Sequence, residues 1–406
     1  MRVAALSEAV LRDDLAAWRG RSAVTRLVLT NFRCYDRLRL ASDGRPVVLT
    51  GPNGAGKTNL LEALSLLAPG RGLRRARLEE IDRRGAAGPG NRWAVAATIE
   101  TPEGLIEIGT AHEAASETAR DIETEAGRGR RAVRVDGAAA RGQAPLAAVA
   151  TIAWLTPEMD RLFLEASSDR RRFLDRLVYG HQPGHASRVA AYEQAMRERN
   201  RLLRERLGDS AWLDALEQRM AEESVAIAAA RNDVVARLNG AMALTEGPFP
   251  RAGLALDGMV EGWLGDGPAL AVEERLRAAL RAARPEDAAA GRTGAGPHRT
   301  DLAARHLEKD RPAGECSTGE QKALLISIVL ADARLVAMQS GATPILLLDE
   351  VAAHLDGRRR AALFDELCAL GAQAWLTGTD RSLFAGLEGR AQFFGVADAA
   401  IRPEAA

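Results

Sequence analysis

The chain has 406 residues, enough for two or three domains, and 47% of them are hydrophobic, so it can bury a sizeable core. Its 55 basic and 55 acidic residues give a formal net charge of zero. Bulk charge therefore gives no support for nucleic-acid binding, and any DNA contact has to come from a local patch. Only three of the basic residues are lysines, so the position of each carries information: Lys57, Lys309 and Lys322.

Neither a disulfide framework nor a membrane segment is expected. The three cysteines, Cys34, Cys316 and Cys368, form no CxxC pair and suit a reducing cytosol. Charged residues from Glu8 onward interrupt the N-terminal region, so we expect no signal peptide. The longest apolar run, 323–331, is much shorter than the roughly 20 residues of a membrane span.

The first 155 residues predict an α/β arrangement. Residues 1–21 read as a polar extension outside the fold. Two apolar runs then predict strands, at 24–29 and 46–50, and helical spacing at 59–67 predicts a helix. Further β-like runs, separated by glycine-rich or charged turns, predict a small antiparallel sheet: 93–99, 105–108 and 132–135.

The pattern changes after residue 156. Residues 157–244 are rich in Arg, Glu, Ala and Leu and predict a lobe of three or four helices, without the heptads of an extended coiled coil. A segment punctuated by Gly and Pro follows (245–270), then a helix (272–283) and a loop (285–297). The last hundred residues predict helices at 319–340 and 358–370 and strands at 345–348 and 374–378.

A phosphate-binding loop lies between the predicted strand 46–50 and helix 59–67. The segment fits GxxxxGK[ST], and its residues are Gly51, Pro52, Asn53, Gly54, Ala55, Gly56, Lys57 and Thr58. The glycines let backbone N–H groups turn toward phosphates, and the helix N-terminus favours negative charge. Lys57 would supply a compact charge to the β- and γ-phosphates, and Thr58 would hold Mg²⁺ through its hydroxyl.

Two acids follow the apolar strand 345–348. A fully apolar strand of this kind is typical of a buried parallel strand. At its carboxyl end, Asp349 would bind Mg²⁺ and Glu350 would polarise the attacking water. Ordinary surface acids after a buried strand are the alternative, and the pairing with the Lys57 loop argues against it.

The segment before helix 319–340 has two readings that can both hold. Ser317 with Glu320 three residues on has the spacing of a capping box. In this context, Ser317, Gly319 and Gln321 also resemble the signature motif of ABC ATPases, which in that class meets the γ-phosphate of ATP held by a second protomer. Asp356 matches the position of the D-loop of the class, and an N-cap before Gly357 is its alternative.

The combination of motifs resembles the RecF family within the ABC/SMC head class. Lys57 and Ser317 are 317 − 57 = 260 residues apart, an interval that resembles RecF, whereas transporter subunits have a tighter arrangement and SMC proteins hundreds of coiled-coil residues. The resemblance covers about residues 24–395. Several segments have sequences similar to those of the family: Asn31 to Tyr35, Gly56 to Ala63, Pro157 to Asp160, Ser168 to Asp175 and Gly296 to Leu302.

The resemblance implies an α/β P-loop ABC-type ATPase head, a mixed sheet with flanking helices and a small antiparallel sheet, carrying an inserted helical lobe. We expect an N-terminal extension, two ATPase parts and the lobe: 1–21, 22–155, 156–270 and 271–406. The implied cofactors are ATP and Mg²⁺, and the implied ATPase is slow.

The implied function is DNA repair. Two protomers would dimerise around ATP on DNA at gaps or single/double-strand junctions, without sequence specificity. Implied partners are RecR and RecO, with RecA loaded downstream, in the cytoplasm and on the nucleoid, in replication-fork maintenance and the SOS response. A transporter ATPase subunit and an SMC-like structural clamp are the alternatives; the long helical insert argues against the first and Glu350 against the second.

Two positions depart from the wider class. The usual switch histidine is replaced by Thr379 and Asp380, either of which would sense the γ-phosphate. The usual glutamine is absent from 154–160, so no residue is assigned that role.

Two arginine-rich segments are candidate DNA surfaces. Residues 168–206 hold ten arginines against five acids, and residues 71–92 hold seven against three. Such patches suit sequence-independent, salt-sensitive phosphate contacts. Solvated helix faces with ion pairs between residues i and i+4 are an equally good interpretation of both.

Overall fold

The computed structural model describes residues 20–83, 92–113, 130–205 and 210–404. Within the chain, two compact units pack separately: residues 1–159, 246–249 and 332–406 form unit 1, and residues 160–245 and 250–331 form unit 2. The extension expected at 1–21 lies almost entirely outside the described residues. The division into functional regions at residues 156 and 270 stays a prediction.

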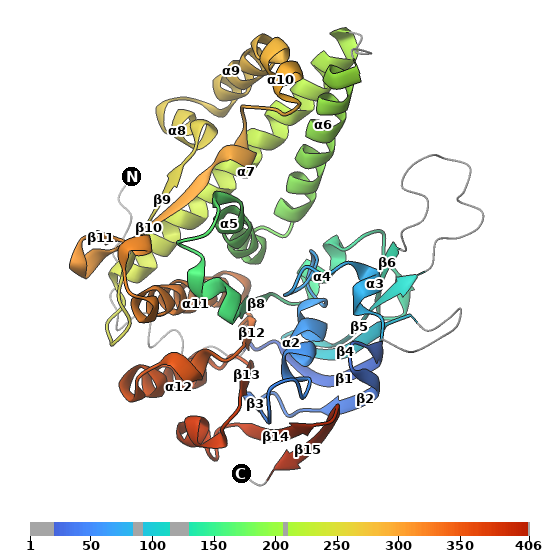
Figure 1. The fold of residues 1–406 in the computed structure, drawn as a ribbon, viewed down its shortest axis with the longest axis vertical. Coiled ribbons are helices and arrows are strands. Elements are labelled where there is room, and N and C mark those ends of the chain that lie inside the picture. Colours follow the sequence, from blue (N-terminus) through green and yellow to red (C-terminus); the bar gives the residue numbers. More distant parts are fainter. Residues whose placement is uncertain (1–19, 84–91, 114–129, 206–209, 405–406) are drawn as a thin grey trace. The chain divides into compact units, whose positions relative to one another are not determined.

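Unit 1 contains a six-stranded antiparallel sheet in the order β2-β1-β4-β5-β6-β7. Figure 1 shows β1, β2, β4 and β5 side by side. The strands are β1 (Ala23–Phe32), β2 (Tyr35–Ala41), β4 (Ala94–Thr101), β5 (Gly104–Glu113), β6 (Arg130–Val135) and β7 (Ala138–Ala139). The predicted antiparallel sheet is therefore confirmed, and it recruits β1 and β2 in addition.

The second sheet of unit 1 has the order β15-β14-β3-β13-β12-β8 and is parallel except for β15 at its edge. Its central strands are apolar and fully buried, which is the pattern of a sheet covered on both faces. The strands are β3 (Val47–Thr50), β8 (Ile152–Leu155), β12 (Ile345–Leu348), β13 (Ala374–Gly378), β14 (Gln392–Ala397) and β15 (Ala400–Glu404).

Helix α2 (Lys57–Ser65) joins the two sheets through one hydrophobic core. It packs against β1 of the first sheet and against β8, β12 and β13 of the second. Leu60, Leu61 and Leu64 are fully buried in the core that the sheets share. The described part of this unit also contains α3 (Leu78–Ile81), α4 (Ala144–Val149) and α12 (Gly357–Leu370). The core therefore fixes the start of α2 against the ends of β3, β12 and β13.

Unit 2 is mainly helical, as predicted for the lobe. Its helices are α5 (Ser167–His181), α6 (His185–Glu205), α7 (Ser210–Ala243), α8 (Met259–Asp266), α9 (Ala269–Ala282) and α10 (Arg284–Ala290). A three-stranded antiparallel sheet accompanies them: β9 (Ala252–Asp257), β10 (Asp301–His306) and β11 (Arg311–Pro312). Buried side chains of α6, α7, α8 and α9 form a separate core.

One sequence expectation needs correction in this unit. The segment 285–297, expected as a loop, begins as helix α10, in which Pro285 occupies the first turn, where a missing N–H costs no hydrogen bond. The segment 245–270, punctuated by glycine and proline, contains the short elements β9 and α8.

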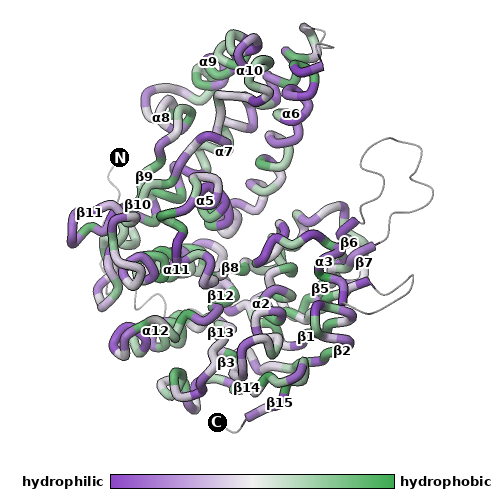
Figure 2. The backbone as a smooth tube through the Cα atoms, viewed as in Figure 1, coloured by the Kyte–Doolittle hydropathy of each residue, from purple (hydrophilic) through white to green (hydrophobic). Residues whose placement is uncertain are grey.

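The apolar part of helix α11 (Thr318–Ser340) extends beyond the run 323–331 that the sequence indicated. By length and composition it could cross a membrane, but 72% of its most apolar window is buried within the protein, as in the core helix of a soluble fold. Figure 2 shows it as a largely hydrophobic stretch. Its first part belongs to unit 2 and the rest to unit 1.

Short 3-10 turns connect these elements, and two of them begin directly after predicted site residues: η6 follows Glu350 and η7 follows Asp380. They are η2 (Pro157–Arg161), η3 (Pro297–Arg299), η4 (Leu307–Lys309), η5 (Ala313–Glu315), η6 (Val351–His354) and η7 (Arg381–Leu387).

Candidate functional site

The loop between β3 and α2 needs its glycines. Gly51 has φ 147°, and a Cβ there would lie 2.1 Å from the carbonyl oxygen of Val396. Gly56 has φ 113°, and a Cβ would lie 2.7 Å from the hydroxyl of Tyr35. Pro52, Asn53 and Gly54 are exposed at the turn, and Ala55 is buried beneath it. The backbone thus forms an open, glycine-dependent cradle at the N-terminus of a helix, which is the form an anion site takes.

Lys57 is buried inside this cradle. Its Nζ donates to the carbonyl oxygens of Gly51 at 2.7 Å and of Pro52 at 2.9 Å. Burial lowers the pKa of Lys57, and the negative charges of Glu350 and Asp349 oppose that shift. A partly desolvated cation that is bonded only to neutral carbonyl oxygens would be stabilised more strongly by an anionic phosphate. Lys57 is therefore suited to bind the phosphates of a nucleotide.

Thr58 and Asp349 meet although 291 positions separate them in the chain. The Thr58 hydroxyl lies 3.0 Å from each carboxylate oxygen of Asp349. On the other side, the Thr377 hydroxyl donates to Oδ1 of Asp349 at 2.6 Å. A hydroxyl beside one carboxylate is the protein part of a site where Mg²⁺ takes its other ligands from phosphates and water. In the described part of the chain, no group of three or more His, Cys, Asp or Glu could hold a metal unaided.

Glu350 is held by its backbone rather than by its side chain. Its N–H donates to Oγ1 of Thr377 at 2.9 Å, and its φ of 51° is in the left-handed region, which a non-glycine residue rarely adopts. The side chain is half-buried, directly after the buried strand β12. Backbone strain of this kind concentrates at functional sites, and here it falls on the residue directly after Asp349. Thr377 therefore orders both acids, a role that sequence reasoning missed.

Two arginines stabilise α2, the helix that follows the loop, through one buried carboxylate. The buried carboxylate of Glu62 in α2 accepts from Arg33 at 2.8 and 2.5 Å and from Arg74 at 2.9 Å. Arg33 lies in the N-terminal segment that carried the family resemblance. This contact explains why that segment and the helix after the loop occur together: one anchors the other.

The segment before α11 forms the predicted capping box. The N–H of Ser317 donates to Glu320 at 2.9 Å, and the N–H of Glu320 lies 3.4 Å from the hydroxyl of Ser317. Lys309 forms an ion pair with Glu320, and together these contacts lower the pKa of Glu320 to about 2, with the lysine as the larger cause. Ser317, Thr318 and Gly319 are exposed. The cap is confirmed; contact with a nucleotide stays a prediction.

Gln321 and Lys322 face the interior instead. The amide of Gln321 is buried and donates to the carbonyl oxygen of Cys316 at 2.8 Å, so in this conformation it braces the turn from within. The Lys322 side chain is only 4% exposed, and its ammonium pairs with Asp160 at 3.0 Å. Asp160 lies in the segment where the usual glutamine of the class is absent. All three lysines of the chain thus lie in or directly behind predicted site motifs.

Asp356 and Asp380 are both caps. Asp356, at the start of α12, accepts from the N–H of Arg359 at 2.9 Å, which lowers its pKa. Asp380 accepts from the N–H of Ser382 at 2.8 Å, which lowers the pKa of that carboxyl too. Both carboxylates and Thr379 are exposed. The N-cap reading of Asp356 is confirmed, and the roles of D-loop and phosphate sensor stay predictions.

Several arginines of the first candidate DNA patch serve the interior of unit 2. Arg170 forms a bidentate pair with Asp301 at 2.7 Å, and Arg171 donates to the carbonyl oxygen of Thr300 at 2.7 Å. Arg199 is fully buried against Glu217 and Asp287. The two family-like segments, 168–175 and 296–302, are therefore partners in folding. For Arg170 and Arg199 the phosphate-contact interpretation is wrong, because their donors are already used inside the protein.

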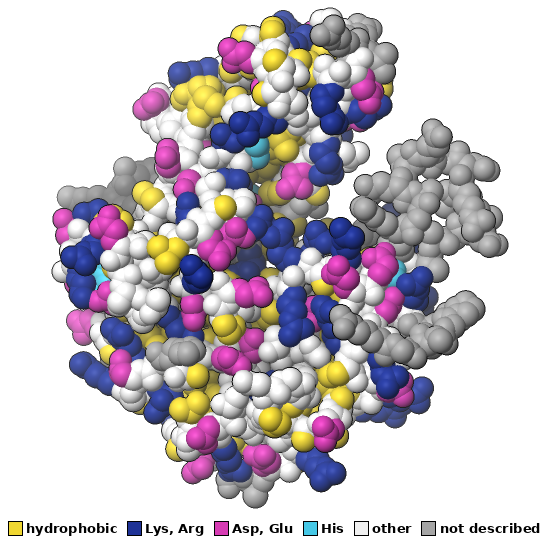
Figure 3. Space-filling model, viewed as in Figure 1, with side chains coloured by type: hydrophobic (Ala, Val, Ile, Leu, Met, Phe, Trp, Pro, Cys, Tyr) yellow, Lys and Arg dark blue, Asp and Glu magenta, His cyan; other side chains and the backbone are white. Residues whose placement is uncertain are grey.

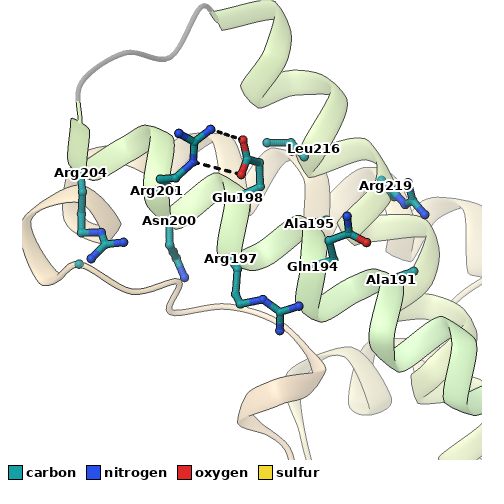
Figure 4. A pocket seen from close by; sticks show the side chains of 11 residues that line it. Ala191, Gln194, Ala195, Arg197, Glu198, Asn200, Arg201, Arg204, Leu216 and Arg219 are labelled. Carbon is teal, nitrogen blue, oxygen red and sulfur yellow. Dashed lines mark hydrogen bonds and ion pairs between the residues drawn. The ribbon is translucent and has the colours of Figure 1, made fainter. Parts of the chain in front are cut away.

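Three other arginines of that patch, Arg197, Arg201 and Arg204, line a groove of about 580 Å³ between α6 and α7. Figure 4 shows its arginines, among which Arg201 is bonded to Glu198 and therefore partly neutralised. Arg197 lies 3.6 Å from Glu193. Arg219 also lines the groove. Its positive charge is thus weaker than the count of arginines indicated.

The second patch is also largely paired among its described residues. Besides Arg74 on Glu62, Arg92 pairs with Asp82 at 2.9 Å and Arg83 lies 3.5 Å from Asp36. Figure 3 shows basic and acidic side chains interspersed over the visible face. Neither predicted patch forms a uniform basic surface.

Comparisons with known proteins give consistent matches over nearly the whole chain. The family model described as RecF/RecN/SMC N terminal domain matches residues 23–399. A DNA replication and repair protein RecF of Mesorhizobium japonicum is 51% identical over 383 residues, which cover 94% of this chain and 97% of that protein. The RecF of Rhizobium rhizogenes is 50% identical over 380 residues, covering 93% and 98%.

Solved structures are similar at the level of the fold. A recombination mediator protein RecF-ATPrS of the RecFOR pathway has a TM-score of 0.79 at 20% identity, covering 95% of this chain and 99% of that one. An Smc head domain from Pyrococcus furiosus has a TM-score of 0.51 at 15% identity, covering 94% and 96%. The predicted fold class is therefore confirmed.

Proposed function

The chain belongs to the RecF family of DNA replication and repair proteins, and we propose that it is an ATPase that dimerises around ATP on DNA. The observation that carries this is the meeting of Lys57, Thr58 and Asp349, with Glu350 next in the chain, in one site of unit 1. Those four side chains provide a phosphate cation, a magnesium site and a base, which is the minimum equipment for hydrolysing a nucleoside triphosphate.

Each residue has a distinct proposed task. Gly51 to Gly56 cradle the phosphates through backbone N–H groups, and Lys57 exchanges its carbonyl acceptors for phosphate oxygens. Thr58 and Asp349 hold Mg²⁺, which neutralises charge on the transferred phosphate. Glu350 orients and deprotonates the attacking water. Thr379 or Asp380 would sense the γ-phosphate.

The dimer follows from the exposed signature segment. Ser317 and Gly319 expose an N-terminal helix turn, which favours an anion, and its capping contacts leave that face open. We propose that this turn approaches the γ-phosphate of ATP bound by Lys57 of a second copy, with Gln321 bracing the turn and Asp356 crossing the same interface. Slow hydrolysis would then separate the copies.

The proposed DNA binding and the proposed repair partners are inferred from membership of the family. We propose sequence-independent binding of duplex DNA and of single/double-strand junctions or gaps, and partnership with RecR and RecO in loading RecA. The work would take place in the cytoplasm, at the nucleoid when DNA is bound, in replication-fork repair and SOS induction. The transporter interpretation has no support from relatives named RecF at about half identity over nearly the whole chain.

Fluorescence anisotropy on a gapped duplex, with and without ATP and Mg²⁺, tests this proposal. Wild type should bind more tightly with ATP, and Lys57→Arg should lose that increase because the planar guanidinium fits the cradle poorly. Equal binding with and without ATP, or an unaffected Lys57→Arg, would count against a nucleotide-gated DNA-binding protein.

A further inference from the structure

Within the described part of the chain, the antiparallel sheet of unit 1 has one covered and one open face. Residues on its inner face, such as Leu27, Leu29 and Val95, are buried in the core with α2. Alternate residues point the other way and stay partly or fully exposed. Because the exposed side chains follow the strand period over five adjacent strands, this is a continuous surface and not a set of isolated positions.

The floor of the open face is built from small side chains. Cα partners across the sheet give one row of Arg39, Val28, Ala96, Gly109 and Arg134. The neighbouring row is Arg37, Thr30, Ala94, Ala111 and Ala132. Directly opposed residues share a face, so all members of a row lie on the same face. Each row begins with an arginine on β2 and continues with small side chains on β1, β4 and β5. Val28, Ala96, Gly109 and Arg134 of the first row also line a shallow trough of about 380 Å³, together with Arg26, Thr98 and Glu107 of the same face.

Arginines lie on both edges of this open face of the sheet. Arg37 and Arg39 are exposed on β2, Arg26 on β1 and Arg134 on β6. Among the described residues, none of these four forms an ion pair, whereas Arg197 and Arg201 of the α6–α7 groove do. The one acid that lines the trough is Glu107. Nearby Glu100 and Glu113 are paired with Arg21 and Arg130. The trough is therefore the less neutralised basic surface.

We propose that this face of the sheet binds the phosphate backbones of duplex DNA. Adjacent strands are about 4.8 Å apart, so β2 and β6 place their arginines about 19 Å from each other, far enough to reach two separate backbones. A floor of Ala, Gly, Val and Thr lets a broad, rigid ligand approach closely. Phosphate contacts of this type position a protein without reading sequence.

Single-stranded DNA fits the face less well. Single-strand sites combine basic grooves with aromatic side chains on which bases stack. Of the outward-facing residues named above, none is aromatic, and the aromatic residues of β1 and β2, Phe32 and Tyr35, are buried on the other side. The inference rests on the proposed DNA binding and adds where on the chain the duplex is held.

The test compares two triple variants that remove the same charge. Arg37→Gln/Arg39→Gln/Arg134→Gln alters the trough. Arg45→Gln/Arg251→Gln/Arg305→Gln is the matched control, because these three exposed arginines lie elsewhere and pair with Asp43, Glu308 and Asp310. Both sets are at the surface, so both should fold, which circular dichroism checks. Binding of a blunt fluorescent duplex, with ATP and Mg²⁺, is measured as a function of salt.

Each lost phosphate contact should reduce the slope of log K against log salt by about 1, so the trough variant should lose about 3 and the control none. The loss should be equal on AT-rich and GC-rich duplexes, and small on a single strand. An unchanged slope in the trough variant, while wild type binds, would overturn this inference and leave the proposed function standing. Equal losses on duplex and single strand would refute the duplex assignment. No duplex binding by wild type would overturn both.

Discussion

The nucleotide loop of unit 1 and the signature segment of unit 2 are held in place by different means. Lys57, Thr58 and Asp349 bond to the loop's own carbonyls or to one another, so the groups that would bind ATP also hold the site together. Ser317 and Gly319 lie exposed, and their support comes from side chains behind them, Lys309 on Glu320 and Lys322 on Asp160. The residues of the nucleotide loop can be recognised from a sequence motif, whereas the side chains that support the signature segment can be recognised only in the structure.

The largest expected effect is at the base. Glu350→Gln should lower the rate of ATP hydrolysis by about 100-fold or more, since general-base catalysis contributes roughly 10²–10⁴. ATP affinity should change little, because phosphate binding is assigned to Lys57 and the backbone cradle. Steady-state phosphate release, with nucleotide binding measured in parallel, checks both. Equal turnover by variant and wild type would place the base elsewhere.

Nucleotide affinity distinguishes the loop from the signature segment. Lys57→Ala should weaken ATP binding by roughly 100-fold, equivalent to about 2.7 kcal/mol, because the buried point charge on the phosphates is lost. Since burial already disfavours the charged lysine, the variant should be no less stable to heat. Titration with a fluorescent ATP analogue and thermal denaturation provide the two readings. Retained affinity would contradict the assignment of Lys57.

Removing the ion pair that supports the signature segment should lower stability and association while leaving ATP affinity nearly unchanged. Lys322→Met leaves the Asp160 carboxylate, whose side chain is 27% exposed, without its cation. We expect a loss of roughly 1–2 kcal/mol in unfolding free energy, less than for a fully buried pair because of that exposure. ATP-dependent association should weaken while ATP affinity stays within about two-fold of wild type.

Lys322→Arg, which keeps the positive charge, is the matched control for that change and should recover most of the stability. Denaturant unfolding and nucleotide titration decide the matter. If Lys322→Met weakened ATP binding as much as Lys57→Ala, the separation between the two regions would be wrong.

The regular elements and the site motifs could be predicted because they rest on local signals. Apolar runs located β3, β12 and β13, and the glycines with Lys57 and Thr58 located the loop. Long-range partners carry no such signal. Thr377, which orders Asp349 and Glu350, looks like any other residue of a buried strand, and Arg33 meets Glu62 only after two sheets close around α2.

Charge was the least predictable property. Segment 168–206 is rich in arginine, yet Arg170 and Arg199 use their donors inside unit 2. Conversely, Arg37, Arg39 and Arg134 lie outside the two segments predicted as DNA surfaces, and they come to one face of the sheet only through strand pairing. A linear count of charges cannot see which face a strand presents or which donors are already used.

The smallest expected effect is a pH dependence at the cap. The pKa of Glu320 is lowered from its ordinary 4.5 to about 2 in the folded chain, so its contacts stabilise the fold above pH 4.5 and lose that contribution as the pH falls from 4.5 toward 2. Glu320→Gln should cost less than about 1 kcal/mol at neutral pH, since the pair is near the surface.

That difference between wild type and Glu320→Gln should be constant from neutral pH down to about 5.5 and shrink at lower pH. Denaturant unfolding at several pH values measures it. A difference that grew on acidification would mean that the carboxylate is not stabilised in the folded state.

The central claim is that ATP joins two copies through the loop of one and the signature segment of the other. Sedimentation of the Glu350→Gln variant, with and without ATP and Mg²⁺, tests it most directly, because slow hydrolysis preserves any complex. The account predicts a shift from one 43.4 kDa chain to two on adding ATP, absent in a variant that also carries Lys57→Ala. A variant that binds ATP yet sediments as a single chain at every concentration would contradict it.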